Sequence, residues 1–80
     1  MTSVTVLYFA SLRDAAGSDR ETFATAAADL RALYGELSGR HGFKLPADRL
    51  RVAVDGAFAR WEEAPREGAE IAFIPPVSGG

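Results

Sequence analysis

Cysteine is absent from the 80 residues of this sequence. Its absence excludes a disulfide framework, a thiolate metal site and a persulfide group carried on the chain itself. The sequence also lacks any run of the roughly 18 apolar residues that a membrane-spanning helix needs. We therefore expect packing alone to stabilise the fold, and we expect no association with a membrane.

Charge of one sign is not concentrated anywhere along the chain. Nine basic and eleven acidic residues are interspersed and give a formal net charge of -2. No cationic stripe is present that would neutralise the phosphates of a nucleic acid. The first residues carry no basic leader of the kind that directs export. The sequence thus predicts a cytoplasmic protein that does not bind nucleic acid.

The short length limits how the chain can act. A chain of 80 residues forms one domain around one core. A chain this small buries only roughly 60% of the surface that its unfolded form exposes, so little area is left for a deep substrate pocket. The sequence therefore disfavours an enzyme that is complete in itself.

Runs of β-branched and aromatic residues predict five strands. They cover residues 4–10, 20–25, 50–54, 57–61 and 69–74. Asp55-Gly56, between the third and fourth strands, is a strong signal for a tight hairpin turn. A short helical turn over residues 11–17 is expected to begin at the hydroxyl of Ser11 and to end at a left-handed Gly17.

The main helix is predicted from an apolar stripe. Leucine and tyrosine recur with the 3.6-residue period of a helix at positions 30, 33, 34 and 37. The helix is expected over residues 27–38, with Thr25 capping its start and Asp29 in its first turn. Gly39, Arg40 and Gly42 are expected to end it.

Strand parity divides the large apolar side chains between the two faces of the sheet. One set is assigned to the face that the helix covers: Val6, Tyr8 and Phe73. The other set has the opposite parity: Leu7, Phe9, Phe58 and Ile74. One amphipathic helix covers only one face of a mixed sheet. The sequence therefore predicts an α+β domain over residues 1–74 whose other sheet face is left to solvent or a partner.

Two further patterns have ordinary structural explanations. His41, the only histidine, is expected to help close the helix end, where a cation is favoured. No nucleophile with an orienting acid is near it in the sequence, so a catalytic role is not expected. Glu62-Glu63 is expected to be a solvated turn, because adjacent residues do not face one site. We predict no metal site.

The last six residues, Pro75-Pro76-Val77-Ser78-Gly79-Gly80, are the most informative segment. The proline pair lacks backbone donors, so the last strand stops and residues 75–80 are expected to project from the sheet. Gly79 and Gly80 have no Cβ and fit a slot too narrow for other residues. A glycine pair alone is typical of a frayed terminus. After a rigid proline pair, it has the shape needed to deliver the Gly80 carboxylate into another protein's active site.

Three segments together resemble one family over the whole chain. They are LYFASLRDAAG at residues 7–17, RVAVDG at 51–56 and EGAEIAFIPPVSGG at 67–80. The sequence is similar to the small, sulfur-carrying subunit of molybdopterin synthase, which has the ubiquitin-like β-grasp fold. The resemblance implies a mixed sheet of about five strands, covered on one face by one main helix. Departures from the usual residues of the family, at Asp55, Pro65 and Ala69, fall in turns.

The resemblance also implies the chemistry. In that family an ATP-dependent enzyme adenylates the terminal glycine, here Gly80, which then becomes a thiocarboxylate. The large synthase subunit takes in the tail, and the sulfur passes to a cyclic pterin precursor of the molybdenum cofactor. The residues implied to enter the large subunit are Pro75, Pro76, Val77, Ser78 and Gly79. The implied docking residues are Phe9, Phe58 and Ile74. The chain itself binds no cofactor, and the implied complex holds two copies of each subunit.

Two alternatives share the same tail chemistry. One is a sulfur carrier for the thiazole of thiamin, and the other is a ubiquitin-like modifier that forms isopeptide bonds with lysines. All three proteins would be activated in the same way. The acceptor distinguishes them, because it is a pterin precursor, a thiazole precursor or a target lysine.

Overall fold

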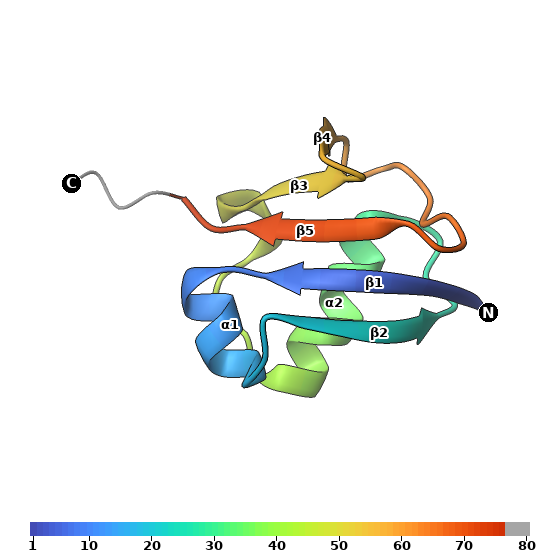
Figure 1. Ribbon diagram of the computed structural model, residues 1–80. Helices are drawn as coiled ribbons and strands as arrows, with labels where there is room; N and C mark the ends of the chain where they lie inside the picture. Colours follow the sequence, from blue (N-terminus) through green and yellow to red (C-terminus); the bar gives the residue numbers. More distant parts are fainter. Residues whose placement is uncertain (77–80) are drawn as a thin grey trace.

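A five-stranded sheet with helices packed on one side is the framework of the computed structural model, which describes residues 1–76 (Figure 1). The strands are β1 Thr2–Tyr8, β2 Arg20–Thr25, β3 Arg51–Val54, β4 Ala57–Ala59 and β5 Glu70–Ile74. The helices are α1 Ala10–Ala16, α2 Leu30–His41 and the short 3₁₀ helix η1 Ala47–Arg49.

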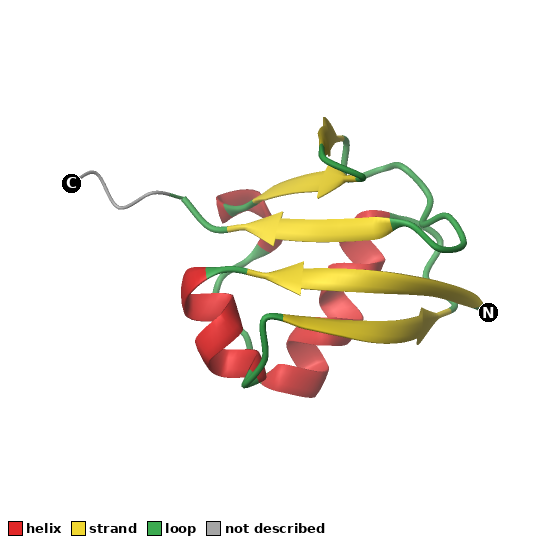
Figure 2. Cartoon of the chain, viewed as in Figure 1, coloured by secondary structure: helices red, strands yellow, loops and turns green. Residues whose placement is uncertain are grey.

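The sheet is mixed, and its strand order is β2-β1-β5-β3-β4 (Figure 2). β1 pairs in parallel with β5, whereas the β1–β2, β3–β5 and β3–β4 pairs are antiparallel. The last strand therefore lies at the centre of the sheet. The predicted mixed sheet of five strands with one main helix on one face is confirmed.

The core lies between the sheet and α2. Each residue of the predicted helical stripe, at positions 30, 33, 34 and 37, is buried. Val6, Tyr8 and Phe73 of the sheet are buried against them, as strand parity predicts. Full burial of one such apolar side chain contributes about 1.5–3 kcal/mol. α1 adds Leu12 to this core, and its partly buried Ala16 packs against it.

The start and the N-cap predicted for the main helix are wrong, whereas Gly42 ends the helix as predicted, as a C-cap with φ of 73°. α2 begins three residues later than expected, at Leu30, and continues through Gly39 to His41. Its N-cap is Asp29, whose carboxylate accepts a hydrogen bond of 2.8 Å from the Ala32 N–H. An Asp in extended backbone at this position satisfies an otherwise free amide of the first turn. Thr25 lies outside the helix, and its hydroxyl accepts from the Ala27 N–H at 2.9 Å.

A distant turn completes the start of α2. The Leu30 N–H donates to the Glu63 carbonyl at 2.9 Å, and the Arg31 N–H donates to the Trp61 carbonyl at 3.1 Å. The Trp61 ring stacks on Phe73 with 5.9 Å between centroids. β4 ends at Ala59 and not at residue 61 as predicted, because the chain turns at residues 60–63, where the Glu63 N–H donates to the Arg60 carbonyl at 3.1 Å.

The short helix also begins differently from the prediction. Its N-cap is Phe9, which makes no side-chain capping bond, and Ser11 lies inside α1. The predicted end is confirmed, because Gly17 has φ of 76° and its N–H donates to the Arg13 carbonyl. Ala10 has φ of 50°, a left-handed conformation that costs a residue with a Cβ roughly 1–2 kcal/mol.

The hairpin between β3 and β4 forms where the sequence predicts it. Asp55 and Gly56 have φ of 51° and 86°, and two positive values are the signature of a type I′ turn. The Asp55 carboxylate also accepts a hydrogen bond of 2.9 Å from the Glu70 N–H. The turn is thereby tied to the beginning of β5.

Candidate functional site

The C-terminal tail begins at the end of the central strand of the sheet. β5 ends at Ile74, and Pro75 and Pro76 follow directly. Neither proline has a backbone N–H to continue a ladder. The tail therefore begins at the C-terminal end of β5, and the loop that precedes the strand lies at its other end (Figure 1). The remaining residues of the predicted tail, Val77, Ser78, Gly79 and Gly80, lie outside the described residues.

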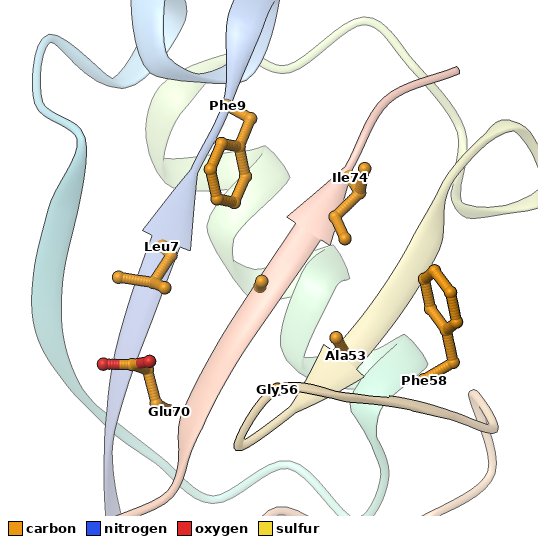
Figure 3. A pocket seen from close by; sticks show the side chains of 8 residues that line it. Leu7, Phe9, Ala53, Gly56, Phe58, Glu70 and Ile74 are labelled. Carbon is orange, nitrogen blue, oxygen red and sulfur yellow. The ribbon is translucent and has the colours of Figure 1, made fainter. Parts of the chain in front are cut away.

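An apolar surface lies on the sheet face opposite α2, beside the start of the tail. Residues that are paired across strands point to the same face of a sheet. One such row joins Leu7 to Ala72, Ala72 to Ala53 and Ala53 to Phe58. Phe9 and Ile74 lie next to it on the side of the tail, as Figure 3 shows. We call these six residues the open face.

Two large apolar side chains of the open face are exposed to solvent. Only three large apolar side chains in residues 1–76 are exposed, and two of them are Phe9 at 46% and Phe58 at 67%. The third is Met1, at the N-terminus. The structure therefore brings together Phe9, Phe58 and Ile74, the three predicted docking residues, around the root of the tail.

The centre of the open face is a shallow hollow of about 260 Å³. Ala53 (Figure 3) and its cross-strand partner Ala72 both line the hollow, and their short side chains leave space between the larger ones. Its volume is below the roughly 300–1,000 Å³ of most small-molecule pockets. Such a hollow suits a side chain of a protein partner better than it suits a free substrate.

Comparison with known proteins identifies the family. The model of the ThiS family matches residues 6–80 of this chain, including all of the tail. The chain belongs to the ThiS family. The relationship predicted from its three sequence segments is confirmed.

Two curated relatives of this ThiS-family chain are both named molybdopterin synthase sulfur carrier subunit. The molybdopterin synthase sulfur carrier subunit of Haemophilus influenzae is 37% identical over 79 residues, which covers 94% of this chain and 96% of the relative. The protein of the same name from Escherichia coli is 31% identical, with 96% and 99% covered. The crystal structure of SAMP1, small archaeal modifier protein 1, from Haloferax volcanii is 31% identical. It superposes with a TM-score of 0.78 over 98% of this chain and 99% of that chain.

The other face of this ThiS-family sheet carries a polar cluster that the sequence did not reveal. Glu21 of β2 accepts a hydrogen bond from the Tyr8 hydroxyl, and His41 Nε2 lies 2.5 Å from the same carboxylate oxygen. The Arg40 guanidinium is 3.7 Å from the second oxygen. His41 thus ties the end of α2 to an edge strand, a role beyond the predicted closing of the helix. The cluster is structural, because Tyr8 points away from the open face.

Glu21 is held ionised by this cluster. Burial acts to raise its pKa, but the hydrogen bonds from Tyr8 and His41, together with the charges of His41 and Arg40, outweigh burial and hold the pKa below its ordinary value. Burial and the bond to Glu21 raise the pKa of Tyr8, so the phenol stays protonated. The pKa of Glu21 is therefore lower in the folded chain than in the unfolded chain. Its stabilising effect is fully present above the pKa of the unfolded state, and it is lost as the pH falls through the pKa of the folded state.

We expect Glu21→Gln to destabilise the fold by about 1 kcal/mol at pH 7, because the charge-assisted bonds are weakened. The difference from wild type should shrink as the pH falls below 4.5, the ordinary value for glutamate. Urea denaturation at pH 7 and at successively lower pH measures it. Glu62→Gln, at an exposed carboxylate paired only with Arg60, is the control and should match wild type throughout. A difference in unfolding free energy between Glu21→Gln and wild type that does not change with pH would contradict the assignment of Glu21 as ionised.

The Glu62-Glu63 pair is part of a turn, as the sequence predicts. The Glu63 carboxylate accepts from the Arg60 N–H at 2.8 Å, and its backbone carbonyl accepts from the start of α2. Glu62 makes an exposed ion pair with Arg60 at 3.6 Å. Within residues 1–76, no three metal-ligating side chains lie together, and no helix is long and apolar enough to cross a membrane.

Proposed function

We propose that this chain is the sulfur-carrying subunit of molybdopterin synthase and acts in the cytoplasm. The observation that carries the proposal is the point at which the tail begins. A segment that ends in Gly79-Gly80 leaves the central strand beside an exposed apolar face. The names of the relatives from Haemophilus influenzae and Escherichia coli support the same role.

The proposed chemistry takes place at the Gly80 carboxylate. A carboxylate is a poor electrophile because its oxygen is a poor leaving group. A carboxylate oxygen attacks the α-phosphorus of ATP on an activating enzyme, pyrophosphate departs, and an acyl adenylate forms. Hydrosulfide then attacks the acyl carbon and displaces AMP, and loss of its proton leaves a thiocarboxylate. The carrier holds its sulfur without a thiol side chain, which agrees with the absence of cysteine.

The proposed partner in sulfur transfer is the large subunit of molybdopterin synthase. Phe9, Phe58 and Ile74 would dock on it, since an exposed apolar group of this kind is typical of an interaction site. Docking at the root of the tail would place residues 75–79 in the active site of that subunit and bring Gly80 to the pterin precursor. We propose two copies of each subunit in the complex, as the family resemblance implies.

The second candidate function is protein modification. Its support is the likeness to SAMP1 of Haloferax volcanii, at 31% identity over nearly the whole chain. A modifier would pass the activated Gly80 carbonyl to a lysine amine and form an isopeptide bond. A thiamin thiazole carrier would use the same thiocarboxylate with a different acceptor. Activation is common to all three, so the test must follow the acceptor.

Mass spectrometry after incubation with the activating enzyme, ATP and a sulfur donor should show one oxygen replaced by one sulfur at Gly80. Addition of the large synthase subunit and the pterin precursor should then return the carboxylate and yield a dithiolene product. A chain that lacks Gly79 and Gly80 is the control and should remain unmodified. Sulfur found upstream of Gly80, or conjugation to lysine without dithiolene product, would contradict the proposal.

A further inference from the structure

The eight arginines of the chain divide into two groups by ion pairing. Four of them lie within 4.0 Å of a carboxylate: Arg31, Arg40, Arg60 and Arg66. The other four are exposed and make no ion pair within residues 1–76: Arg13, Arg20, Arg49 and Arg51. Exposed charges without a partner contribute little to the fold, so their placement points to a use outside it.

Two of the unpaired arginines lie on the β1 side of the open face. Arg20 is paired across strands with Leu7, so both side chains project from the same face of the sheet. Arg13, from α1, lines a small hollow with Arg20, Leu7 and Phe9. These two cations therefore adjoin the apolar residues next to the tail. Asp19 is the one carboxylate that lines the same hollow.

The other two lie on the β3 side of the same face. Arg51 is paired across strands with Ile74, and its guanidinium carbon is 5.2 Å from the centre of the Phe58 ring. Arg49 lines a hollow with Ile74 and the two prolines that begin the tail. Asp48 is in that hollow, but its carboxylate is paired with an arginine of α2. We call Arg13, Arg20, Arg49 and Arg51 the basic rim.

The basic rim is positively charged, whereas the rest of the molecule carries a net negative charge. The chain carries a formal charge of -2, and without these four arginines five basic residues would face eleven acidic ones. The end of the open face away from the tail carries Glu70 and Asp55 instead. Positive charge is thus gathered at the tail end of the open face. The apolar centre between the arginines favours a protein partner over a nucleic acid, whose binding needs a continuous basic surface.

We propose that the basic rim steers this chain onto a ring of carboxylates on the large synthase subunit, around the opening that admits the tail. The proposal rests on the proposed function and adds the charge of the partner's surface. Charged groups at the edge of an interface mainly raise the association rate and fix orientation. The apolar open face then holds the complex. Orientation matters here, because the tail must meet its opening when the two proteins first touch.

The test uses the variant Arg13→Gln/Arg20→Gln/Arg49→Gln of the full chain. Arg51 is left in place because its contact with Phe58 belongs also to the apolar surface. Stopped-flow measurements give the association and dissociation rates with the large synthase subunit at about 50 mM and about 500 mM salt, where screening differs strongly. The control is Arg66→Gln, at an exposed arginine that is paired with Asp55 away from the tail.

The triple variant should associate roughly tenfold more slowly than wild type at the low salt concentration, and nearly as fast at the high one. Its dissociation rate should stay within about twofold, and Arg66→Gln should follow wild type in both rates. Equal association rates for wild type and the triple variant at low salt would overturn the proposal that the basic rim steers association. So would a slowing that salt does not remove. If wild type itself does not bind the large subunit, the proposed function fails, and the inference fails with it.

Discussion

Gly79→Val should lower the yield of dithiolene product at least a hundredfold while leaving the fold as stable as wild type. The substitution adds a branched Cβ to a tail residue that, in the proposed function, passes through a narrow slot in a partner. Displacing a reacting group by about 1 Å can cost on the order of a hundredfold in rate. A surface substitution away from packed features usually changes stability by no more than about 0.5 kcal/mol.

Two measurements separate these effects. Thermal unfolding reports stability, and single-turnover assays follow adenylation and sulfur transfer in turn. Gly79→Ala adds only one methyl group and should fall between wild type and Gly79→Val. Near-normal product from Gly79→Val would show that the tail does not need a narrow slot.

Phe58→Glu should weaken binding to the large synthase subunit by about thirtyfold or more and leave the fold intact. Phe58 is 67% exposed and lies outside the core cluster, so the change removes no buried contact. Aromatic anchors at the centre of an interface often contribute 2 kcal/mol or more. The nearby Arg51 offers the new carboxylate a partner in the free protein.

Calorimetric titration measures this loss of affinity, and urea denaturation checks the fold. Ala24→Glu is the matched control, because it places the same charge at an exposed position on the same sheet face, at the end of edge strand β2 away from Arg20 and the tail. It should bind as wild type does. Equal weakening by both variants would mean that charge alone, and not the Phe58 ring, sets the affinity.

The strands, the hairpin and the division of side chains between faces were predictable because each depends on neighbours in sequence. Val6 and Tyr8 alternate with Leu7 and Phe9, and this period of two determines which side chains are buried. Asp55-Gly56 needs only its own positive φ angles to form a turn. The residues at the root of the tail could therefore be assigned to one face without knowledge of the strand order.

The remaining features depend on residues far apart in the chain. The start of α2 is fixed in part by the Trp61 and Glu63 carbonyls, about thirty residues further along the chain, which explains the error in its predicted bounds. The link from Tyr8 through Glu21 to His41 joins two strands and a helix. No local pattern indicates such contacts.

The basic rim also depends on residues that are far apart in the chain. Arg20 and Arg51 come to either side of the tail only because β5 is inserted between β1 and β3. Along the sequence they are ordinary, well-separated charges. The alanines that line the open-face hollow carry no signal of their own, for the same reason.

The position of β5 also has a mechanical consequence. The strand that continues into the tail is hydrogen bonded to β1 along one edge and to β3 along the other. Traction on the tail acts along β5, while the ladder bonds lie across it, so many bonds bear the load together in shear. An edge strand such as β2 or β4 is held by ladder bonds along one side only. In the proposed function, a partner that grips and releases the tail therefore pulls on a strand that is anchored along both of its edges.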